Sequence, residues 1–205
     1  MGFTADKLKA SLDALAKIEP AFDRTLARIG YPEPRIRPRG HETLLRAIIG
    51  QQVSIKAAAA ILARVEAATG GIGDPSNIAR TSDEALRAAG LSRQKIAYLR
   101  SLAEDVLSGR LDFDHLPEDE EEAIAALTHV KGIGRWTAEV YLLFAEGRTD
   151  IFPAGDLAVQ IEIGRILGLP ERPTEKKTRE LAEPWRPHRG AAAIFAWHHR
   201  HVVPV

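Results

Sequence analysis

Residues 127–138 read Leu-Thr-His-Val-Lys-Gly-Ile-Gly-Arg-Trp-Thr-Ala, and this stretch predicts two helices joined by a tight turn. An apolar pattern of helical period runs before it from Pro117 to about Leu127, and another follows from Arg135 to about Ala145. Gly132 and Gly134 lie between the two patterns, where the lack of a Cβ atom allows a sharp turn. The sequence therefore predicts a helical hairpin over about residues 118–146.

A hairpin of this kind can hold an anion such as a DNA phosphate. The first N–H groups of a helix have no partner inside the helix, and the helix dipole favours negative charge there. Lys131 and Arg135 add positive charge beside the turn. The backbone carbonyls of Thr128, Val130 and Ile133 could hold a monovalent cation, Na⁺ or K⁺, that bridges to the phosphate. Taken alone, Gly-Ile-Gly also fits an ordinary helix–helix turn, so both interpretations stay open at this point.

The rest of the chain also shows helical patterns, and no convincing strand alternation is present. Residues 31–40 hold three prolines and predict an extended linker. Gly50 is a candidate helix end and Ser54 a candidate N-cap, which puts Gln51, Gln52 and Val53 in a tight bend. The helices predicted outside the hairpin lie at about residues 8–18, 22–29, 42–50, 55–68, 82–89, 92–108, 156–167, 174–182 and 187–201. The predicted fold class is all-α.

Composition narrows the classes of function. The 205 residues include no cysteine, which excludes disulfides, thiolate nucleophiles and cysteine-held iron–sulfur clusters. The 28 basic and 28 acidic side chains cancel, but basic residues gather in 31–56 and 171–205, so one face can still be basic. No apolar run reaches the length of a membrane span, and no signal-peptide pattern is present. We therefore expect an intracellular protein, cytoplasmic and with no membrane contact.

Three further motifs accompany the hairpin. Gly-Gln-Gln-Val-Ser spans residues 50–54, Phe-Pro-Ala-Gly-Asp spans 152–156, and Trp-Arg-Pro-His-Arg spans 185–189 with Trp197 downstream. Together with the hairpin they resemble the helix-hairpin-helix (HhH-GPD) DNA glycosylases over roughly residues 40–200, in particular the 3-methyladenine DNA glycosylase II type. The resemblance implies a two-lobed all-α fold with the active site in the cleft between the lobes. We expect residues 41–149 to form the lobe with the hairpin, and residues 1–40 with 150–205 the lobe with the catalytic Asp.

The resemblance also implies roles for individual residues. It makes Asp156 the catalytic carboxylate and Gln52 the wedge that fills the gap left by a flipped base. An alkylated purine is a cation, which the face of a Trp attracts. The expected base pocket consists of Trp136, Trp197, Gln51, Val140 and Leu157. The expected DNA contacts are Gln52, Ser54, Lys131, Gly132, Ile133, Gly134, Arg135 and Thr137. Without the resemblance, the Trp residues would be assigned to the core and the glutamines to a polar loop.

Asp156 follows a glycine at the expected start of a helix, where Asp is also a common N-cap. Helix dipole and N–H groups would keep its carboxylate ionised, so it can stabilise an oxocarbenium-like transition state and orient or deprotonate water. In the resembling enzymes that also cut the DNA backbone, a Lys that forms a Schiff base replaces Trp136. The resemblance therefore implies a monofunctional hydrolase.

Several points stay open. Many relatives have aromatic residues where this chain has Leu157 and Val140, so hypoxanthine and ethenoadenine stand beside 3-methyladenine and 7-methylguanine as candidate bases. The alternatives are a non-catalytic DNA-binding protein and a glycosylase for other damaged bases. Three histidines, His198, His199 and His201, lack a further ligand at suitable spacing, so no catalytic metal is expected. No cofactor is expected beyond the hairpin cation. We expect a monomer that binds double-stranded DNA.

Overall fold

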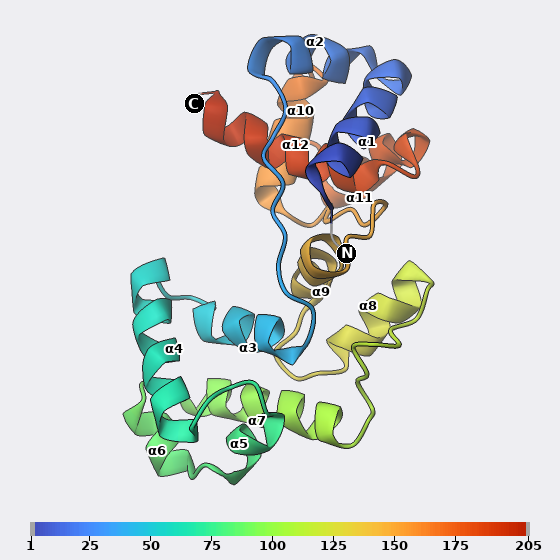
Figure 1. The fold of residues 1–205 in the computed structure, drawn as a ribbon. Helices are drawn as coiled ribbons and strands as arrows, with labels where there is room; N and C mark the ends of the chain where they lie inside the picture. The colour runs from blue at the N-terminus through green and yellow to red at the C-terminus, as the bar shows by residue number, and fades with distance from the viewer. Residues whose placement is uncertain (1–2, 204–205) are drawn as a thin grey trace. The chain divides into compact units, whose positions relative to one another are not determined.

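The computed structural model describes residues 3–203, which form helices joined by loops and contain no strand (Figure 1). The all-α prediction is confirmed. Contacts divide the chain into two compact units, Met1–Arg37 with Glu139–Val205 and Pro38–Ala138. The second boundary falls inside a helix, α9 (Arg135–Tyr141). The expected boundary lay at residue 149. Residues 139–149 instead belong to the unit formed by the two chain ends, because Phe144 O accepts from Arg37 N and Thr149 O accepts from Gly190 N.

The unit Pro38–Ala138 holds the helices before the hairpin. In it, α3 packs against α4 and α7, and α5 packs along α7. Buried aliphatic side chains such as Ile48, Val65 and Leu99 fill the space between these helices. Its complete helices are α3 (His41–Gly50), α4 (Ile55–Thr69), α5 (Pro75–Arg80), α6 (Asp83–Ala88), α7 (Arg93–Leu107) and α8 (Glu120–Thr128).

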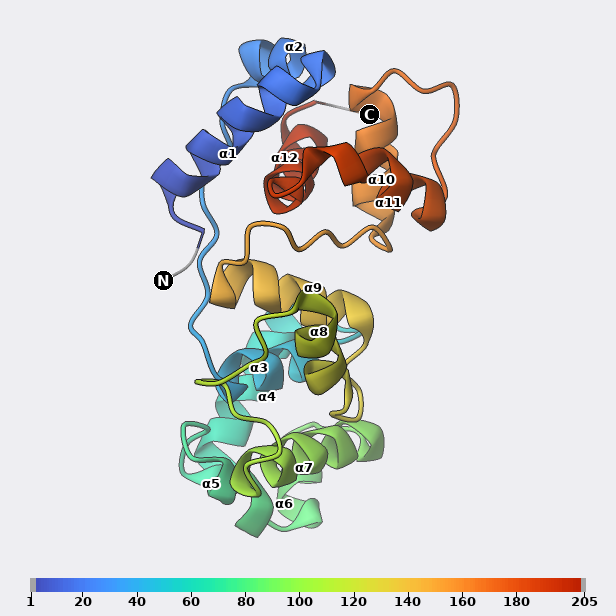
Figure 2. The same ribbon diagram turned by 90° about the vertical axis from the view of Figure 1, so that its right-hand side faces the viewer.

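The other unit joins the two ends of the chain. In it, α10 packs along α12 and α1 packs along α2 (Figure 2). The ring of Phe22 meets the buried ring of Trp185 edge-on, with centroids 5.1 Å apart. This packing ties the N-terminal helices to the segment before α12. Its helices are α1 (Ala5–Ile18), α2 (Pro20–Ile29), α10 (Leu157–Ile166), α11 (Glu175–Ala182) and α12 (Arg189–Val202).

Some local predictions need correction. Pro117 does not open a helix: α8 begins at Glu120, because the side chain of Asp119 caps it by accepting from Glu122 N at 2.9 Å. The helix after the hairpin was expected to reach Ala145, but the α-helical part ends at Tyr141 and a π-helical turn follows over Leu142–Glu146. The short helix α5 was not predicted, because Pro75 directly follows a glycine-rich loop. Among residues 3–203, no helix is long and apolar enough to cross a membrane.

Candidate functional site

The hairpin turn joins α8 to α9. Gly132 has φ 87°, a left-handed conformation that favours glycine. The ring of Tyr98 lies directly against it, since a Cβ atom at residue 132 would stand 2.2 Å from Tyr98 Cδ2. Gly134 differs, because its φ is not positive and a Cβ atom there would meet open space. The predicted turn is confirmed, and of its two glycines only Gly132 is required by backbone conformation and packing.

The bend after α3 is tied to this turn. Gln51 Nε2 donates to the carbonyl oxygen of Gly132 at 2.9 Å. Lys95 Nζ donates to Ile49 O at 2.7 Å, and burial lowers the pKa of this amine. Ser54 caps α4 as predicted, accepting from Ala57 N at 3.2 Å. Bend and turn therefore form one surface within the unit Pro38–Ala138, which we call the hairpin–bend surface (residues 51–56 and 129–135).

Gln52 stands out within the bend. It has φ 56° and is the non-glycine residue with a positive φ in the described part of the chain. Its side chain is exposed, while the side chain of the neighbouring Gln51 is bonded to the hairpin turn. A non-glycine residue in this conformation is strained, and such strain gathers at binding and catalytic sites. The geometry fits a side chain held out for contact, as the wedge prediction requires.

Charge on the hairpin–bend surface is partly matched within the protein. Lys131 is exposed, and its backbone N donates to Ser101 Oγ at 3.2 Å. Arg135 makes a two-point ion pair with Glu121, with Arg135 Nη1 2.8 Å from Glu121 Oε2. An exposed pair of this kind is worth only about 0–1 kcal/mol. A phosphate could therefore displace Glu121, whereas Lys131 can meet a phosphate directly.

Asp156 begins α10 in the other unit. Its Oδ1 accepts from Val159 N at 3.0 Å, so the predicted N-cap is confirmed. The preceding loop is fixed, because Asp156 N donates to Pro153 O at 2.9 Å and Gln160 Nε2 donates to Ala154 O at 2.8 Å. The carboxylate is half-buried at the positive end of the helix dipole. This arrangement holds the carboxylate in one position.

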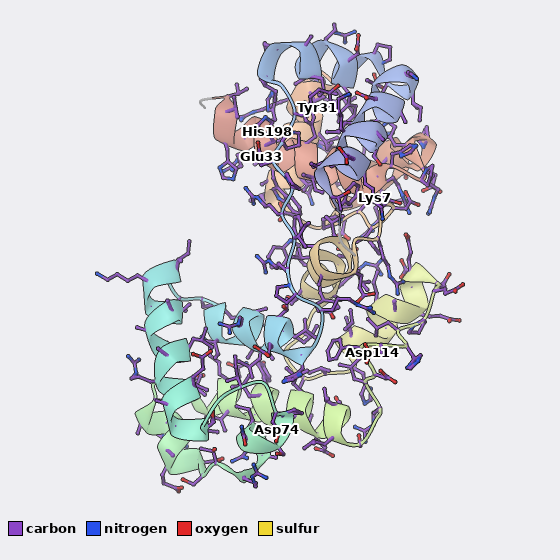
Figure 3. All side chains as sticks on the ribbon, viewed as in Figure 1. Lys7, Tyr31, Glu33, Asp74, Asp114 and His198 are labelled. Carbon is purple, nitrogen blue, oxygen red and sulfur yellow. The ribbon has the colours of Figure 1, made fainter. Side chains whose placement is uncertain are left out.

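Trp197 on α12 is half-buried and stacks on Phe144, with ring centroids 5.6 Å apart. It opens on a cavity of about 460 Å³ within the same unit. Tyr31, Glu33 and His198, which lie close together in Figure 3, share that cavity. The complete lining is Tyr31, Pro32, Glu33, Arg35, Phe144, Ile194, Trp197, His198 and His201. A cavity with aromatic walls suits a planar ring. Phe144 and the linker residues of this lining carry no motif in the sequence that would have indicated the cavity.

The remaining expected pocket residues are spread over both units. Trp136 lies half-exposed in the unit Pro38–Ala138, whereas Val140, Leu157 and Asp156 belong to the other unit. Thr137 is half-buried, and Ile133 is buried in the turn rather than facing outward. The assignment of these side chains to one base pocket, and the cleft between lobes, stay predictions.

The sequence also failed to indicate a buried ionic cluster. Glu162 is fully buried, and its Oε2 contacts His199 Nδ1 at 2.7 Å, while Arg165 reaches its other oxygen at 3.0 Å. The available signal was a charged residue, Glu162, among the mostly apolar residues at positions 157–166. His199 is thus a structural partner of Glu162. Within residues 3–203 no group of three or more His, Cys, Asp or Glu side chains could hold a metal ion.

Comparison with known proteins gives consistent matches. A family model described as HhH-GPD superfamily base excision DNA repair protein matches residues 45–187. DNA-3-methyladenine glycosylase 1 of Schizosaccharomyces pombe is 38% identical over 190 residues, which is 89% of this chain and 83% of that protein. DNA-3-methyladenine glycosylase 2 of Escherichia coli is 31% identical over 209 residues, covering 91% of this chain and 71% of that protein.

Solved structures agree with these relatives. The crystal structure of a DNA-3-methyladenine glycosidase from Bacillus halodurans matches with a TM-score of 0.87 and 35% identity, over 92% of this chain and 88% of that one. The 3-methyladenine DNA glycosylase of S. pombe in complex with abasic DNA matches with a TM-score of 0.80 and 32% identity, over 95% of this chain and 98% of that one. The fold and the sequence therefore point to the same group of proteins.

Proposed function

The chain belongs to the HhH-GPD superfamily of base excision DNA repair proteins, and on this premise we propose that it removes alkylated purines from DNA. The reaction is hydrolysis of the N-glycosidic bond between the damaged base and deoxyribose. Relatives that match most of this chain are named DNA-3-methyladenine glycosylases. The first candidates for the excised base are 3-methyladenine and 7-methylguanine.

One observation carries the proposal: the carboxylate of Asp156, held at the start of α10 by Val159 N at 3.0 Å. Loss of the base leaves positive charge on the sugar, and a preorganised carboxylate stabilises that charge without having to reorient. The same group can orient water or accept its proton. An alkylated purine is already a good leaving group because it is a cation, so the reaction needs no general acid.

The other parts of the site serve binding. The turn at Gly132 and the exposed Lys131 suit a DNA phosphate, a contact that positions the duplex without reading its sequence. Gln52 would replace the flipped base in the stack. Trp197 and Phe144 offer aromatic faces, and a Trp face attracts a cationic ring. The relative solved with abasic DNA supports DNA as the partner.

We extend the proposal to finer points. The substrate is double-stranded DNA, the enzyme acts as a monomer in the cytoplasm where genomic DNA is accessible to it, and no iron–sulfur cluster takes part because the chain has no cysteine. The proposal includes a Na⁺ or K⁺ ion bound by the hairpin carbonyls of Thr128, Val130 and Ile133. Val130 O accepts from Ile133 N at 3.1 Å, and a carbonyl oxygen has a second lone pair with which to meet a cation.

The experiment is release of free bases from methylated DNA, identified by chromatography, for the wild type and Asp156→Asn. We expect 3-methyladenine or 7-methylguanine from the wild type and a rate lower by at least about 100-fold from the variant. Asp74→Asn is the matched control, because Asp74 also caps a helix, accepting from Ser76 N at 2.8 Å. Equal rates for wild type and Asp156→Asn would contradict the proposal and favour the non-catalytic DNA-binding alternative.

The monofunctional mechanism has a separate test. Cutting of the DNA backbone requires a Schiff base between an amine and the abasic sugar, and Trp136 offers no amine. Borohydride should therefore trap no covalent complex between the protein and abasic DNA. A trapped complex that survives replacement of the N-terminal amine would show lyase activity and contradict this part of the proposal.

A further inference from the structure

We propose that Val53 and Ile55 form an apolar edge that packs against deoxyribose rings of the DNA next to the damaged base. This inference rests on the proposed function for the identity of the partner. It adds hydrophobic contact to a surface whose other contacts are polar, and it assigns a role to side chains that neither the phosphate site nor the catalytic carboxylate uses.

Exposure is the first observation. The side chain of Ile55 is 91% exposed, while the other exposed large apolar side chains of the described residues lie between 38% and 55%. A single apolar side chain on a surface is common. Ile55, however, stands at the first position of a fifteen-residue helix, α4, where a polar residue would cost nothing. Its exposure therefore suggests contact with something outside the chain.

Backbone geometry joins Ile55 to Val53. Ser54 between them is extended, with φ −67° and ψ 156°, while its side chain turns inward to cap α4. Val53 and Ile55 flank Ser54 directly and both are exposed, and the exposed Lys56 follows them.

Continuity with the hairpin identifies the occupant. The bond from Gln51 Nε2 to Gly132 O at 2.9 Å places this edge beside the phosphate-binding turn. Along a DNA strand, phosphates alternate with deoxyribose rings, whose carbon atoms are the apolar part of the backbone. When Lys131 and the turn hold phosphates of one strand, the neighbouring Val53 and Ile55 therefore lie next to the deoxyribose rings of that strand. A protein partner would require a much larger patch, several hundred Å² of apolar surface.

The test is DNA affinity measured over a range of salt concentrations, with a duplex that carries a stable abasic-site analogue. Ile55→Ser should weaken binding about tenfold, or about 1.4 kcal/mol, because apolar area is no longer buried. The loss should be the same at every salt concentration, since no charge changes. Lys131→Gln should behave differently and reduce the slope of log affinity against log salt by about 1.

Two controls keep the result specific. Leu107→Ser removes a comparably exposed side chain, 53% exposed at the end of α7 in the same unit, and should bind like the wild type. Ile55→Leu should bind DNA with wild-type affinity, because it keeps an apolar side chain at this position. The melting temperature of Ile55→Ser should match that of the wild type, because the side chain of residue 55 lies outside the core. Wild-type affinity of Ile55→Ser would overturn the inference. So would a dimer in sedimentation that Ile55→Ser abolishes while DNA affinity is unchanged.

The two proposals fail separately. If the wild type releases alkylated purines and Ile55→Ser binds DNA normally, only the apolar edge is wrong. If Ile55→Ser weakens binding but no base is released by the wild type, the edge stands and the glycosylase proposal is wrong.

Discussion

The hairpin turn and the start of α10 both present the N-terminus of a helix, yet they use it in opposite ways. At the turn, Gly134 stands directly before α9 without a side chain: residue 134 is exposed, and a Cβ atom there would meet open space. At α10, the side chain of Asp156 occupies the helix end and brings its own negative charge there. The first end is the proposed site for an external phosphate, while the second is already occupied by a carboxylate of the chain itself.

This difference separates binding from chemistry. Contacts to phosphate can be shared among backbone groups, Lys131 and the bend, so each single loss is partial. In the proposed mechanism, by contrast, the charge that meets the developing cation comes from the single carboxylate of Asp156. Substitutions at the two helix ends should therefore differ both in size and in which property they change.

The largest effect is expected at Asp156. Asp156→Ala and Asp156→Asn should both lower the excision rate by about 100- to 1,000-fold, because each removes the charge. Only the Ala variant should also lose about 1 kcal/mol of stability, since Asn still caps a helix. Single-turnover excision and urea unfolding measure the two properties. If Asn retained excision, the carboxylate would act only as a cap, and the contrast with the hairpin would disappear.

The next effect is expected at Gly132. Gly132→Ala introduces a left-handed non-glycine residue, at a cost of roughly 1–2 kcal/mol, and its Cβ atom would overlap the ring of Tyr98. Overpacking of this kind costs about 1–3 kcal/mol more. We expect lower thermal stability and much weaker DNA binding. Gly134→Ala is the control and should change neither, because a Cβ atom there meets open space. Similar losses in both variants would show that the turn does not depend on Tyr98.

A smaller and selective effect is expected at Trp197. Trp197→Leu should slow the release of 7-methylguanine, a cation, by about 2- to 30-fold, the range of an interaction between a cation and a Trp face. Release of hypoxanthine, a neutral base, should fall less. Chromatography of both products from one substrate mixture gives the ratio. Equal losses would indicate that Trp197 serves packing with Phe144 and makes no contact with charge.

The smallest effect is expected at Gln51, which was assigned to the base pocket. Its side-chain amide donates to the carbonyl oxygen of Gly132 in the hairpin turn. Gln51→Met removes this hydrogen bond, worth about 1 kcal/mol, and should therefore weaken DNA affinity about fivefold. The excision rate at saturating enzyme should stay unchanged. Separate measurements of DNA affinity and of the single-turnover excision rate distinguish a role in holding the hairpin from a role in the base pocket. A lower rate with unchanged affinity would place Gln51 in the pocket after all.

Local patterns predicted the helices other than α5, the linker, the caps at Ser54 and Asp156 and the hairpin turn. These features depend on residues close in sequence, where periodicity, glycine and capping side chains act directly. Even so, the start of α8 was misplaced, because Pro117 and Asp119 are both typical of helix starts and the cap at Asp119 prevailed.

Contacts between distant segments could not be predicted from those patterns. Nothing in the hairpin indicates that Tyr98 lies on Gly132 or that Gln51 bonds its carbonyl. The buried pair of Glu162 and His199 joins α10 to α12 across 37 positions. Such contacts depend on how complete helices pack, and single residue types do not encode that. The resemblance to a known family supplied the roles of the site residues, but not their partners.

The left-handed backbone of Gln52 has a consequence for natural variation at this position. Gly or Asn would relieve the strain and stabilise the free protein by about 1 kcal/mol. The proposed wedge role therefore implies that Gln52 trades folding stability for reach into the duplex. Selection for thermal stability alone would be expected to remove it. A screen that rewards only melting temperature would thus find better folded proteins that search DNA but hold a flipped base poorly.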